Sequence, residues 1–468
     1  MARDNSEFVS GSDDQHIVLI GGTLIDGRGG KPFVDSAIVI RGQRIAEVRA
    51  NNNFDFGESA KVIDVTGKYV LPGLIDIHVH YADWMGQLFL SHGVTTVKDL
   101  GNDIEWISNI RNEIDRGKMH GPRIIYVGNG LDAPPPDRNT HIGLINRDDA
   151  KRAVQFLHSR GASAIKVREK ISPELLAVVV EESHKLGLPV TGHLKRTDAR
   201  EAALAGIDGI EHVTGFVQAI TNAPRERRSD QDDRQVLISD LKAFSLIESS
   251  AAEELINFLV SRNVTIVPTM PIWWRMATSH RDAFAAEDAE YAKDPALAYI
   301  PENIRALWAS SAFYEIDSPA DLAEVQLGYA KLQSVILTHH QSGGEMLAGS
   351  DTFISIPGLS LHREFVLLRD AGISPLEIIS IATLGNAKFL GKEADLGTIT
   401  TGKLADILVV DENPLEDISN TQSVSLVMKD GQIVDISHDA HYFVSKPKPK
   451  DSAWLEEKLA SEKRSLQQ

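Results

Sequence analysis

The sequence predicts an α/β fold in which a (β/α)8 TIM-like barrel carries a small β-sandwich domain composed of N- and C-terminal segments. Two observations predict the barrel: short apolar runs alternate with helix-period stretches, and reactive side chains stand where those runs end. Short strands with turn residues near both chain ends predict the sandwich. We expect the N-terminal half of the sandwich over 1–70, the barrel over 71–394, the C-terminal half of the sandwich over 395–445, and a linker with a short helix over 446–468.

Eight apolar runs are the candidate barrel strands: 70–80, 94–98, 123–127, 162–167, 188–193, 208–213, 264–269 and 346–350. Helix-period stretches lie between or after them, as at 148–160, 172–186 and 374–390. In a barrel of this kind the reactive groups gather at the carboxyl ends of the strands. The flanking strands are expected at 17–20, 36–41, 45–48, 61–65, 406–410 and 427–436, the last run turning at Asp430-Gly431.

Two connections are too long for plain turns between a strand and a helix. Residues 214–250 carry a dense run of charges, and residues 270–320 are rich in aromatic side chains. Long connections at the catalytic face of a barrel are commonly lids or pocket walls. Trp273 and Trp274 directly follow the seventh strand, so they either line a substrate pocket or pack inside the insertion.

Composition sets limits on the function. The net charge of −18 argues against binding to nucleic acid or to an anionic membrane, and 42% hydrophobic residues suffice for a large core. No cysteine is present, so any metal needs histidine, carboxylate or carbamate ligands. The polar N-terminus has no secretory pattern and no apolar run approaches ~18 residues. We expect a cytoplasmic protein that acts on a small-molecule substrate, with a homo-oligomer left open.

The most informative motif is Leu-Pro-Gly-Leu-Ile-Asp-Ile-His-Val-His at residues 71–80. On a strand, alternate side chains share one face, so His78 and His80 should project together. Neutral imidazole is the commonest nitrogen ligand of zinc-like ions, and two of them form half of a metal site. The alternative is a pair of ordinary core or surface histidines.

Further candidate ligands stand at the ends of later apolar runs: Lys166, His193, His212 and Asp351. Taken singly, each of the two histidines is more readily interpreted as a satisfied core or loop-end residue than as a ligand. Asp351 could also be an ordinary helix N-cap, because Gly-Ser-Asp-Thr is turn chemistry. Their common position at strand ends favours the ligand interpretation.

These six residues, in this order, resemble the amidohydrolase superfamily, and in particular its imidazolonepropionase/prolidase-like branch. The phrase at 71–80, Gly-Val-Thr-Thr-Val-Lys-Asp-Leu-Gly at 93–101 and Gly-Lys-Leu-Ala-Asp-Ile-Leu-Val-Val at 402–410 all carry the resemblance. It extends from about residue 17 to about residue 437. The resemblance implies the same barrel and the same small β-sandwich.

The resemblance also implies a cofactor of two divalent metal ions, with zinc as the expected metal. His78, His80 and Asp351 would hold the more buried ion, and His193 and His212 the more exposed one. A lysine ammonium has a reference pKa of ~10.4 and cannot ligate a metal. In the two-metal relatives the corresponding lysine reacts with carbon dioxide, so Lys166 would become a carbamate that bridges both ions. Its alternative role is packing, with its amine in water or paired with Glu169.

The expected reaction is cleavage of a C–N amide-type bond by metal-bound hydroxide, with Asp351 as proton shuttle. Candidate substrates are dipeptides, N-acyl amino acids and related small amides, or else xenobiotic carbamates, ureas and aryl amides. His141 either donates to the oxyanion or is a plain loop residue. A mononuclear deaminase is a rival, although neither His193 nor His212 begins a His-x-x-Glu motif. A non-catalytic scaffold is the other rival, and it would be expected to lose ligands.

Overall fold

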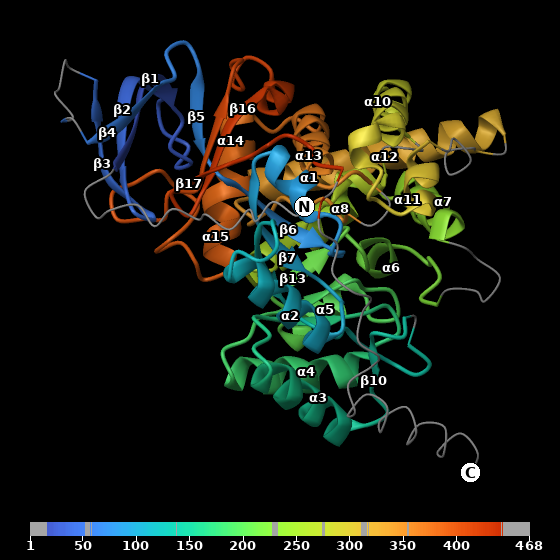
Figure 1. Cartoon of the computed structure of the whole chain (residues 1–468). Helices are drawn as coiled ribbons and strands as arrows, with labels where there is room; N and C mark the ends of the chain where they lie inside the picture. Colours follow the sequence, from blue (N-terminus) through green and yellow to red (C-terminus); the bar gives the residue numbers. More distant parts are fainter. Residues whose placement is uncertain are drawn as a thin grey trace.

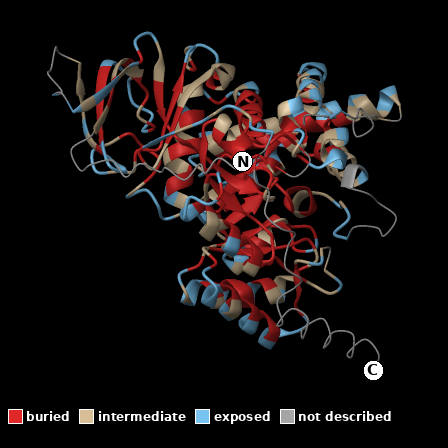
Figure 2. Ribbon diagram, viewed as in Figure 1, coloured by how far each residue is buried: buried red, intermediate tan, exposed pale blue. Residues whose placement is uncertain are grey.

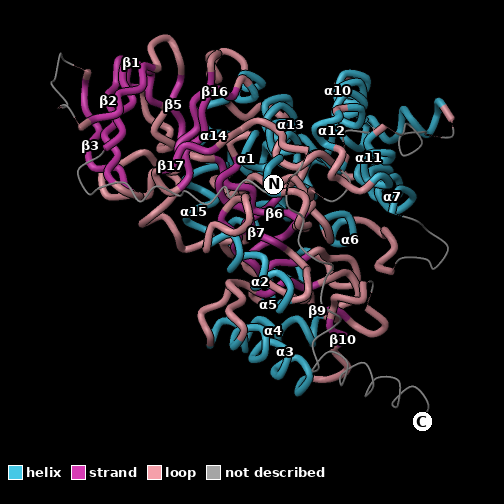
Figure 3. Tube along the Cα trace, in the orientation of Figure 1, coloured by secondary structure: helices cyan, strands magenta, loops and turns pink. Residues whose placement is uncertain are grey.

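The computed structural model describes residues 16–51, 57, 59–136, 138–226, 233–273, 277–309, 316, 318–352, 355–440 and 442. Trp274, which the sequence predicts as a possible pocket residue, lies outside these ranges. The tail 446–468, for which the sequence predicts a linker and a short helix, also lies outside them. A barrel occupies the centre of the molecule and a separate sheet lies at its left in Figure 1. Strands therefore form two groups, as Figure 3 shows, and the predicted fold class is confirmed.

Seven of the eight predicted barrel strands are regular: β6 (Leu74–Val79), β7 (Val94–Asp99), β8 (Arg123–Tyr126), β11 (Ile165–Val167), β12 (Val190–Gly192), β13 (Gly209–Glu211) and β14 (Thr265–Val267). Neighbouring strands pair in parallel, as right-handed β-α-β units require. Two short strands, β9 (Leu131–Asp132) and β10 (Ile142–Gly143), continue the chain after β8, and β9 pairs with β11. The side chains of the barrel strands β6, β11 and β13 are buried along the whole strand, which explains the near-continuous apolar runs in the sequence.

The eighth predicted strand closes the barrel without forming a regular strand. Residues in this segment make parallel bridges on both sides, from Met346 to Ile266 and from Thr352 to Val79. The Asn386 amide donates to Ile75 O at 2.7 Å and to Ala348 O at 2.8 Å, so one side chain ties the segment to β6. The closing segment therefore brings its end against the histidine motif on β6.

Helices surround the barrel: α1 (Gly86–Ser91), α2 (Ile104–Asp115), α3 (Arg147–Ser159), α4 (Pro173–Lys185), α5 (Ala199–Ala205), α8 (Ser249–Ser261), α12 (Pro319–Gln341), α13 (Leu359–Asp370), α14 (Pro375–Ser380), η4 (Ile381–Gly385) and α15 (Asn386–Phe389). Ser172 shows why α4 begins where it does, because its hydroxyl accepts from Leu175 N and a proline follows it. The predicted stretches at 148–160 and 172–186 match α3 and α4. The stretch at 374–390 is helical but contains the π-helical segment η4.

Strands from both ends of the chain share one sheet, with the order β17-β16-β15-β5-β1-β2-β3 and β4 beside β1. These are β1 (His16–Leu24), β2 (Phe33–Arg41), β3 (Arg44–Ala50), β4 (Ala60–Asp64), β5 (Tyr69–Pro72), β15 (Ile407–Val410), β16 (Val424–Lys429) and β17 (Gln432–Val434), with the 3-10 helix η5 (Ile418–Gln422) before β16. Side chains alternate between two cores. Val70 and Val409 enter the sheet's own core, whereas Leu71 and Leu408 enter the barrel core, so the sheet packs on the barrel.

The two long connections fold into helices instead of open loops. They contain α6 (Phe216–Ile220), α7 (Asp233–Ser245), η1 (Met270–Ile272), α10 (Arg281–Lys293), η2 (Pro295–Leu297) and α11 (Glu302–Trp308). Helix α7 packs along α12, and α10 packs on α11, in the lobe at the right of Figure 1. Arg363 of α13 pairs with Asp288 of α10 at 2.7 Å, and both side chains are fully buried, so this lobe is anchored to the barrel.

Buried residues are concentrated in the barrel and along the faces that the helices and the flanking sheet turn toward it (Figure 2). Exposed residues mark the outer helix faces and the far edge of the sheet. Across the described part of the chain, every helix is too short or too polar to cross a lipid bilayer.

Candidate metal centre

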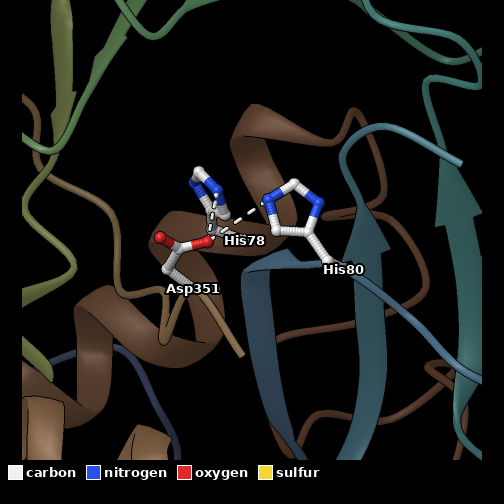
Figure 4. Close-up of side chains that lie close together, drawn as sticks. All are labelled: His78, His80 and Asp351. Atoms are coloured by element: carbon white, nitrogen blue, oxygen red, sulfur yellow. Dashed lines mark ion pairs between the residues drawn. The ribbon is translucent and has the colours of Figure 1, made fainter. Parts of the chain in front are cut away.

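His78 and His80 meet Asp351 at the carboxyl end of β6. The Nε2 atoms of both imidazoles lie 3.3 Å from Asp351 Oδ1, and Figure 4 shows the two rings turned toward the same carboxylate. The alternation of a strand explains this, because residues two apart project to the same side. Ligand atoms of the three residues all lie within 4.8 Å of one another, which is the spacing that a single ion can bridge.

A tight approach of two chain segments places Asp351. Asp351 N donates to His78 O at 2.9 Å, and the residue has a φ of 47°, in the left-handed region. At Gly349 a Cβ atom would lie 2.7 Å from the Cβ of His78, so only glycine lets the closing segment pass this close. The expected ligand set of the more buried ion is thus assembled by the closure of the barrel.

His212 enters the same cluster from the end of β13. Its ring centroid lies 4.6 Å from that of His78, and its Nε2 lies 3.9 Å from Asp351 Oδ2. The Thr269 hydroxyl donates to Pro268 O, so the same oxygen accepts from His212 Nδ1, at 2.5 Å. This places the ring proton on Nδ1 and leaves the Nε2 lone pair facing Asp351. Glu364 in turn fixes the Thr269 turn by accepting from Met270 N at 2.6 Å.

Lys166 lies in the middle of β11 and its amine contacts Oε2 of Glu211. Both side chains are buried, with exposed fractions of 0% and 1%. The other oxygen of Glu211 accepts from the Thr191 hydroxyl at 2.8 Å. The acidic partner of Lys166 is therefore Glu211. The sequence predicts Glu169 as the partner in case Lys166 is only a packed side chain, and the structure has Glu211 in that place.

His193 directly follows β12 and faces His212, with ring centroids 4.7 Å apart. Arg168 Nη1 lies 3.1 Å from His193 Nδ1, and Glu169 Oε1 lies 3.3 Å from His193 Nε2. A guanidinium can only donate, so Nδ1 is the acceptor and Nε2 carries the proton toward Glu169. The lone pair of His193 is therefore on Nδ1, and in this structure it accepts a hydrogen bond from Arg168 Nη1.

His141 and Trp273 occupy different surroundings. His141 is 1% exposed, neither of its ring nitrogens has a hydrogen-bond partner within the described ranges, and a Cβ at Gly101 would meet both His141 and His80. The predicted site histidine therefore lies beside the cluster. Trp273 is 1% exposed and belongs to the main apolar core.

Burial sets the charge of the cluster. Burial lowers the pKa of His78 and of His193 well below their ordinary range, that of His80 to about 4 and that of His212 to about 3. Burial also raises the pKa of Asp351, but the facing histidines outweigh this and hold it well below its ordinary value. At neutral pH the site therefore presents neutral imidazoles around a carboxylate, which are the forms that ligate metal ions.

The donor set fits a divalent metal. His78 is fully buried, and among the described residues neither of its ring nitrogens has a hydrogen-bond partner. Buried polar atoms are normally satisfied, so His78 Nε2, which faces Asp351 Oδ1 at 3.3 Å, requires a proton or an ion shared with that carboxylate. An ion held by His78, His80 and Asp351 would meet that requirement, with an open position left for chemistry.

Sequence reasoning missed four residues of this region: Glu211, Arg168, Thr269 and Glu364. Glu211 directly precedes His212, so regular alternation would send the two side chains to opposite faces. His212 has a φ of 58°, which breaks the alternation and lets both reach the cluster. Arg168 stands two residues after Lys166, and that spacing could have identified it. Thr269 and Glu364 act through contacts between distant segments and leave no local pattern.

Comparison with known proteins shows which family and which folds the chain resembles. The Amidohydrolase family model matches residues 69–434. Ochratoxinase from Aspergillus niger is 23% identical over 91% of this chain and 88% of its own length. An adenine deaminase from Mesorhizobium japonicum is 21% identical over 94% of this chain and 61% of its own length. Among solved structures, a Xaa-Pro dipeptidase with bound methionine is similar with a TM-score of 0.64, at 22% identity, over 90% of this chain and all of the other.

The family match spans well over half of the chain, and the structural likeness extends to both the barrel and the flanking sheet. Members of this family generally bind divalent metals, and the described residues contain candidate His/Asp/Glu metal sites. The chain belongs to the amidohydrolase family and is a hydrolase that acts on carbon–nitrogen bonds.

Proposed function

We propose that this protein is a binuclear metal-dependent amidohydrolase that cleaves the C–N bond of a small amide, such as a dipeptide or an N-acyl amino acid. The observation that carries the proposal is the meeting of His78, His80 and Asp351 around a fully buried imidazole without hydrogen-bond partners among the described residues. Hydrolysis of xenobiotic carbamates, ureas or aryl amides by the same site is the second candidate. A mononuclear deaminase and a non-catalytic scaffold are the lower alternatives.

The proposed ligand assignment follows the free lone pairs. His78, His80 and Asp351 would hold one ion, and His212 through Nε2 with His193 through Nδ1 would hold the other. When bound, two divalent ions, for which zinc is our first choice, would supply a hydroxide nucleophile near neutral pH and polarise the substrate carbonyl.

The domain boundaries at residues 70, 394 and 445 stay a prediction.

Lys166 is proposed to bridge the two ions as a carbamate. Burial, and next the charge of Arg168, lower the pKa of Lys166 well below its ordinary value, which favours the neutral amine that attacks carbon dioxide. The nitrogen forms a bond to the carbon of carbon dioxide and then loses a proton. Glu211, in contact with this amine, is positioned to take that proton.

Asp351 and His141 are the proposed catalytic residues. Asp351 faces both His78 and His80 and is ionised, so it can accept a proton from water and pass it to the leaving nitrogen. Among the described residues the ring nitrogens of His141 have no hydrogen-bond partner, and the ring lies near His80, so it can donate to the developing oxyanion. Trp273, and Trp274 beyond the described ranges, stay candidates for the pocket wall.

A metal count tests the two-metal site. We expect two divalent ions per chain by elemental analysis of the intact protein, and fewer in His78→Ala. His184→Ala is the matched control, because His184 lies on α4, pairs with Asp208 and is 44% exposed. A wild-type chain that never holds more than one tightly bound ion would contradict the binuclear proposal and favour the deaminase alternative. Metal-loaded protein should then be screened for hydrolysis of dipeptides, N-acyl amino acids, aryl amides and carbamates.

Chemical rescue tests the carbamate. Lys166→Ala should lose metal and activity together, and acetate or propionate should partly restore both by occupying the vacated space. Lys166→Arg should show no rescue, because a guanidinium keeps its charge and fills that space. If Lys166→Ala retains both ions and full activity, Lys166 is only a packed side chain.

A further inference from the structure

A second lysine is buried inside the barrel, and the proposed chemistry does not use it. Lys98 lies on β7 and is 1% exposed. The neighbouring Val97 belongs to the main apolar core that the outer helices share, so strand alternation turns Lys98 toward the barrel interior. Lys166 of β11 and Glu211 of β13 are turned inward for the same reason, because the residues next to them also belong to that core. The interior therefore holds three charged side chains from alternate strands, which together fill the layers of such a barrel.

An aromatic ring lies against the Lys98 ammonium. The Nζ atom lies 5.1 Å from the centroid of the Phe389 ring, a distance at which a cation and a ring attract each other. Phe389 packs with buried aliphatic residues of β6, β14 and the closing segment: Ile77, Val267 and Leu347. A Cβ at Gly209 would lie 3.7 Å from Phe389 Cζ and 3.1 Å from Thr191 Cγ2, so the ring and the Thr191 side chain meet over the same glycine. The ring thus joins the Lys98 ammonium to the interior faces of β12 and β13.

Thr191 connects this region with the pair formed by Lys166 and Glu211. Its hydroxyl donates to Glu211 Oε1 at 2.8 Å, and Glu211 Oε2 contacts the Lys166 amine. A line of contacts therefore leads from Lys98 through Phe389, Thr191 and Glu211 to Lys166. Burial and neighbouring positive charges, that of Lys98 among them, lower the pKa of Lys166 well below its ordinary value. The charge of Lys98 is thus felt at the amine that the proposed carboxylation uses.

Carboxylation reverses the charge that Glu211 meets. In this structure Glu211 contacts an amine, whereas a carbamate on Lys166 would bring a negative charge to the same place. Glu211 is 1% exposed, and a buried carboxylate is costly unless a cation compensates it. The effective dielectric constant of a protein interior is low, so a charge there acts over a longer distance than at the surface. Carboxylation therefore increases the need for a positive charge inside the barrel.

We propose that Lys98 is a positioning residue for the carbamate: its ammonium, held against Phe389 inside the barrel, compensates the negative charge that carboxylation of Lys166 places beside Glu211. The proposal rests on the carbamate of the proposed function and names the group that stabilises it. Burial lowers the pKa of Lys98 to about 7, and the charge of Asp208 acts in the opposite direction. A new anion in the interior raises this pKa, so the ammonium persists where the carbamate forms. Lys98 acts through Lys166 and Glu211 and is not a catalytic residue.

Bicarbonate dependence tests the proposal on the full chain, reloaded with zinc at graded concentrations of carbon-13 bicarbonate. Carbon-13 nuclear magnetic resonance measures the carbamate, and elemental analysis measures the bound metal. We expect Lys98→Met to need about 10-fold more bicarbonate or more for half of its carbamate, because methionine fills the space without the charge. Saturating bicarbonate should restore the carbamate and metal content of the wild type. Lys98→Arg should stay near the wild type, since a guanidinium keeps the charge and stacks on an aromatic ring. Lys185→Met is the control, because Lys185 pairs with Glu181 on α4 and is 55% exposed.

The outcomes separate this proposal from the proposed function. A wild type without carbamate at any bicarbonate concentration would overturn the carbamate, and the role of Lys98 with it. The same bicarbonate dependence in the wild type and in Lys98→Met would overturn the role of Lys98 alone. A loss of carbamate that saturating bicarbonate does not restore would also overturn it, because Lys98 would then only pack the interior. Lys98→Gln, which keeps a polar head without the charge, should repeat the result of Lys98→Met, and circular dichroism of each variant checks that it is folded.

Discussion

Replacing Thr269 by valine should weaken metal binding without disturbing the barrel. The two side chains have nearly the same shape, so the change removes only the hydroxyl that accepts from His212 Nδ1 at 2.5 Å. Without this acceptor the ring can rotate or carry its proton on Nε2, where the lone pair is needed. Loss of such a partner typically lowers metal affinity 10- to 100-fold, which corresponds to about 1.4 to 2.8 kcal/mol.

Competition with a chromophoric chelator measures this loss directly. Thr269→Ser is the matched control because it keeps the hydroxyl. Thr269 has a φ of 46°, which a β-branched residue rarely adopts, so serine should also fold at least as well. Near-wild-type affinity for both ions in Thr269→Val would refute the reasoning, since His212 would then be oriented by something other than this hydrogen bond.

Three further predictions concern Asp351 and two buried pairs elsewhere in the molecule. Asp351→Asn should retain most of its metal and lose about 100-fold or more in kcat, measured with any amide that the wild type cleaves, because an amide cannot take the proton. Acid should lower the free energy of unfolding measured in urea titrations. Burial lowers the pKa of His92 to about 3 from 6.5, and its Nε2 accepts a hydrogen bond from the Tyr291 hydroxyl. As the pH falls from 6.5 toward 3, the unfolded chain therefore binds a proton at His92 that the folded chain does not bind. Tyr291→Phe should reduce this dependence. Arg363→Met should cost about 3 to 5 kcal/mol of unfolding free energy by removing the guanidinium from the buried Asp288 carboxylate, and Asp288→Leu in the same chain should restore much of it.

The sequence predicts those features of the site that depend on strand periodicity. His78 and His80 share one face because residues two apart do so on any strand, and the barrel brings the ends of its strands together. The turn at Asp430-Gly431 was also predictable, since both residues have positive φ, as a two-residue hairpin loop requires. Local pattern and observed structure agree wherever the backbone stays regular.

The features that could not be predicted depend on irregular backbone or on contacts between distant segments. Glu211 joins the cluster only because the chain turns into a left-handed conformation at His212. Glu364 reaches the Thr269 turn from a helix 94 positions away in sequence. The role of the long insertions as lids or pocket walls stays a prediction, and their helices pack in pairs, α7 on α12 and α10 on α11. The spacing of apolar residues along the sequence does not indicate which helices pack on each other.

The turns that carry the expected ligands are strained, and the barrel holds them. His212, Thr269 and Asp351 have φ values of 58°, 46° and 47°, and such a conformation costs on the order of 1 to 3 kcal/mol per residue. Neighbouring strands and helices stabilise each turn, through His212 N to Val267 O at 2.8 Å, Met270 N to Glu364 at 2.6 Å and Asp351 N to His78 O at 2.9 Å. None of these bonds involves a metal, so the ligand set is assembled by the fold itself.

Removing the metal should therefore leave the protein folded. After treatment with a chelator we expect unchanged far- and near-ultraviolet circular dichroism, because the backbone bonds that fix the ligands remain. Returning the ions should raise the unfolding temperature by mass action, with a stabilisation of about 2.7 kcal/mol at a free metal concentration 100 times Kd. In His78→Ala this increase should be reduced, because one ion has lost a ligand. Collapse of the circular dichroism on chelation would show instead that the metal holds the barrel together, and the strained turns would then owe their conformation to the ion.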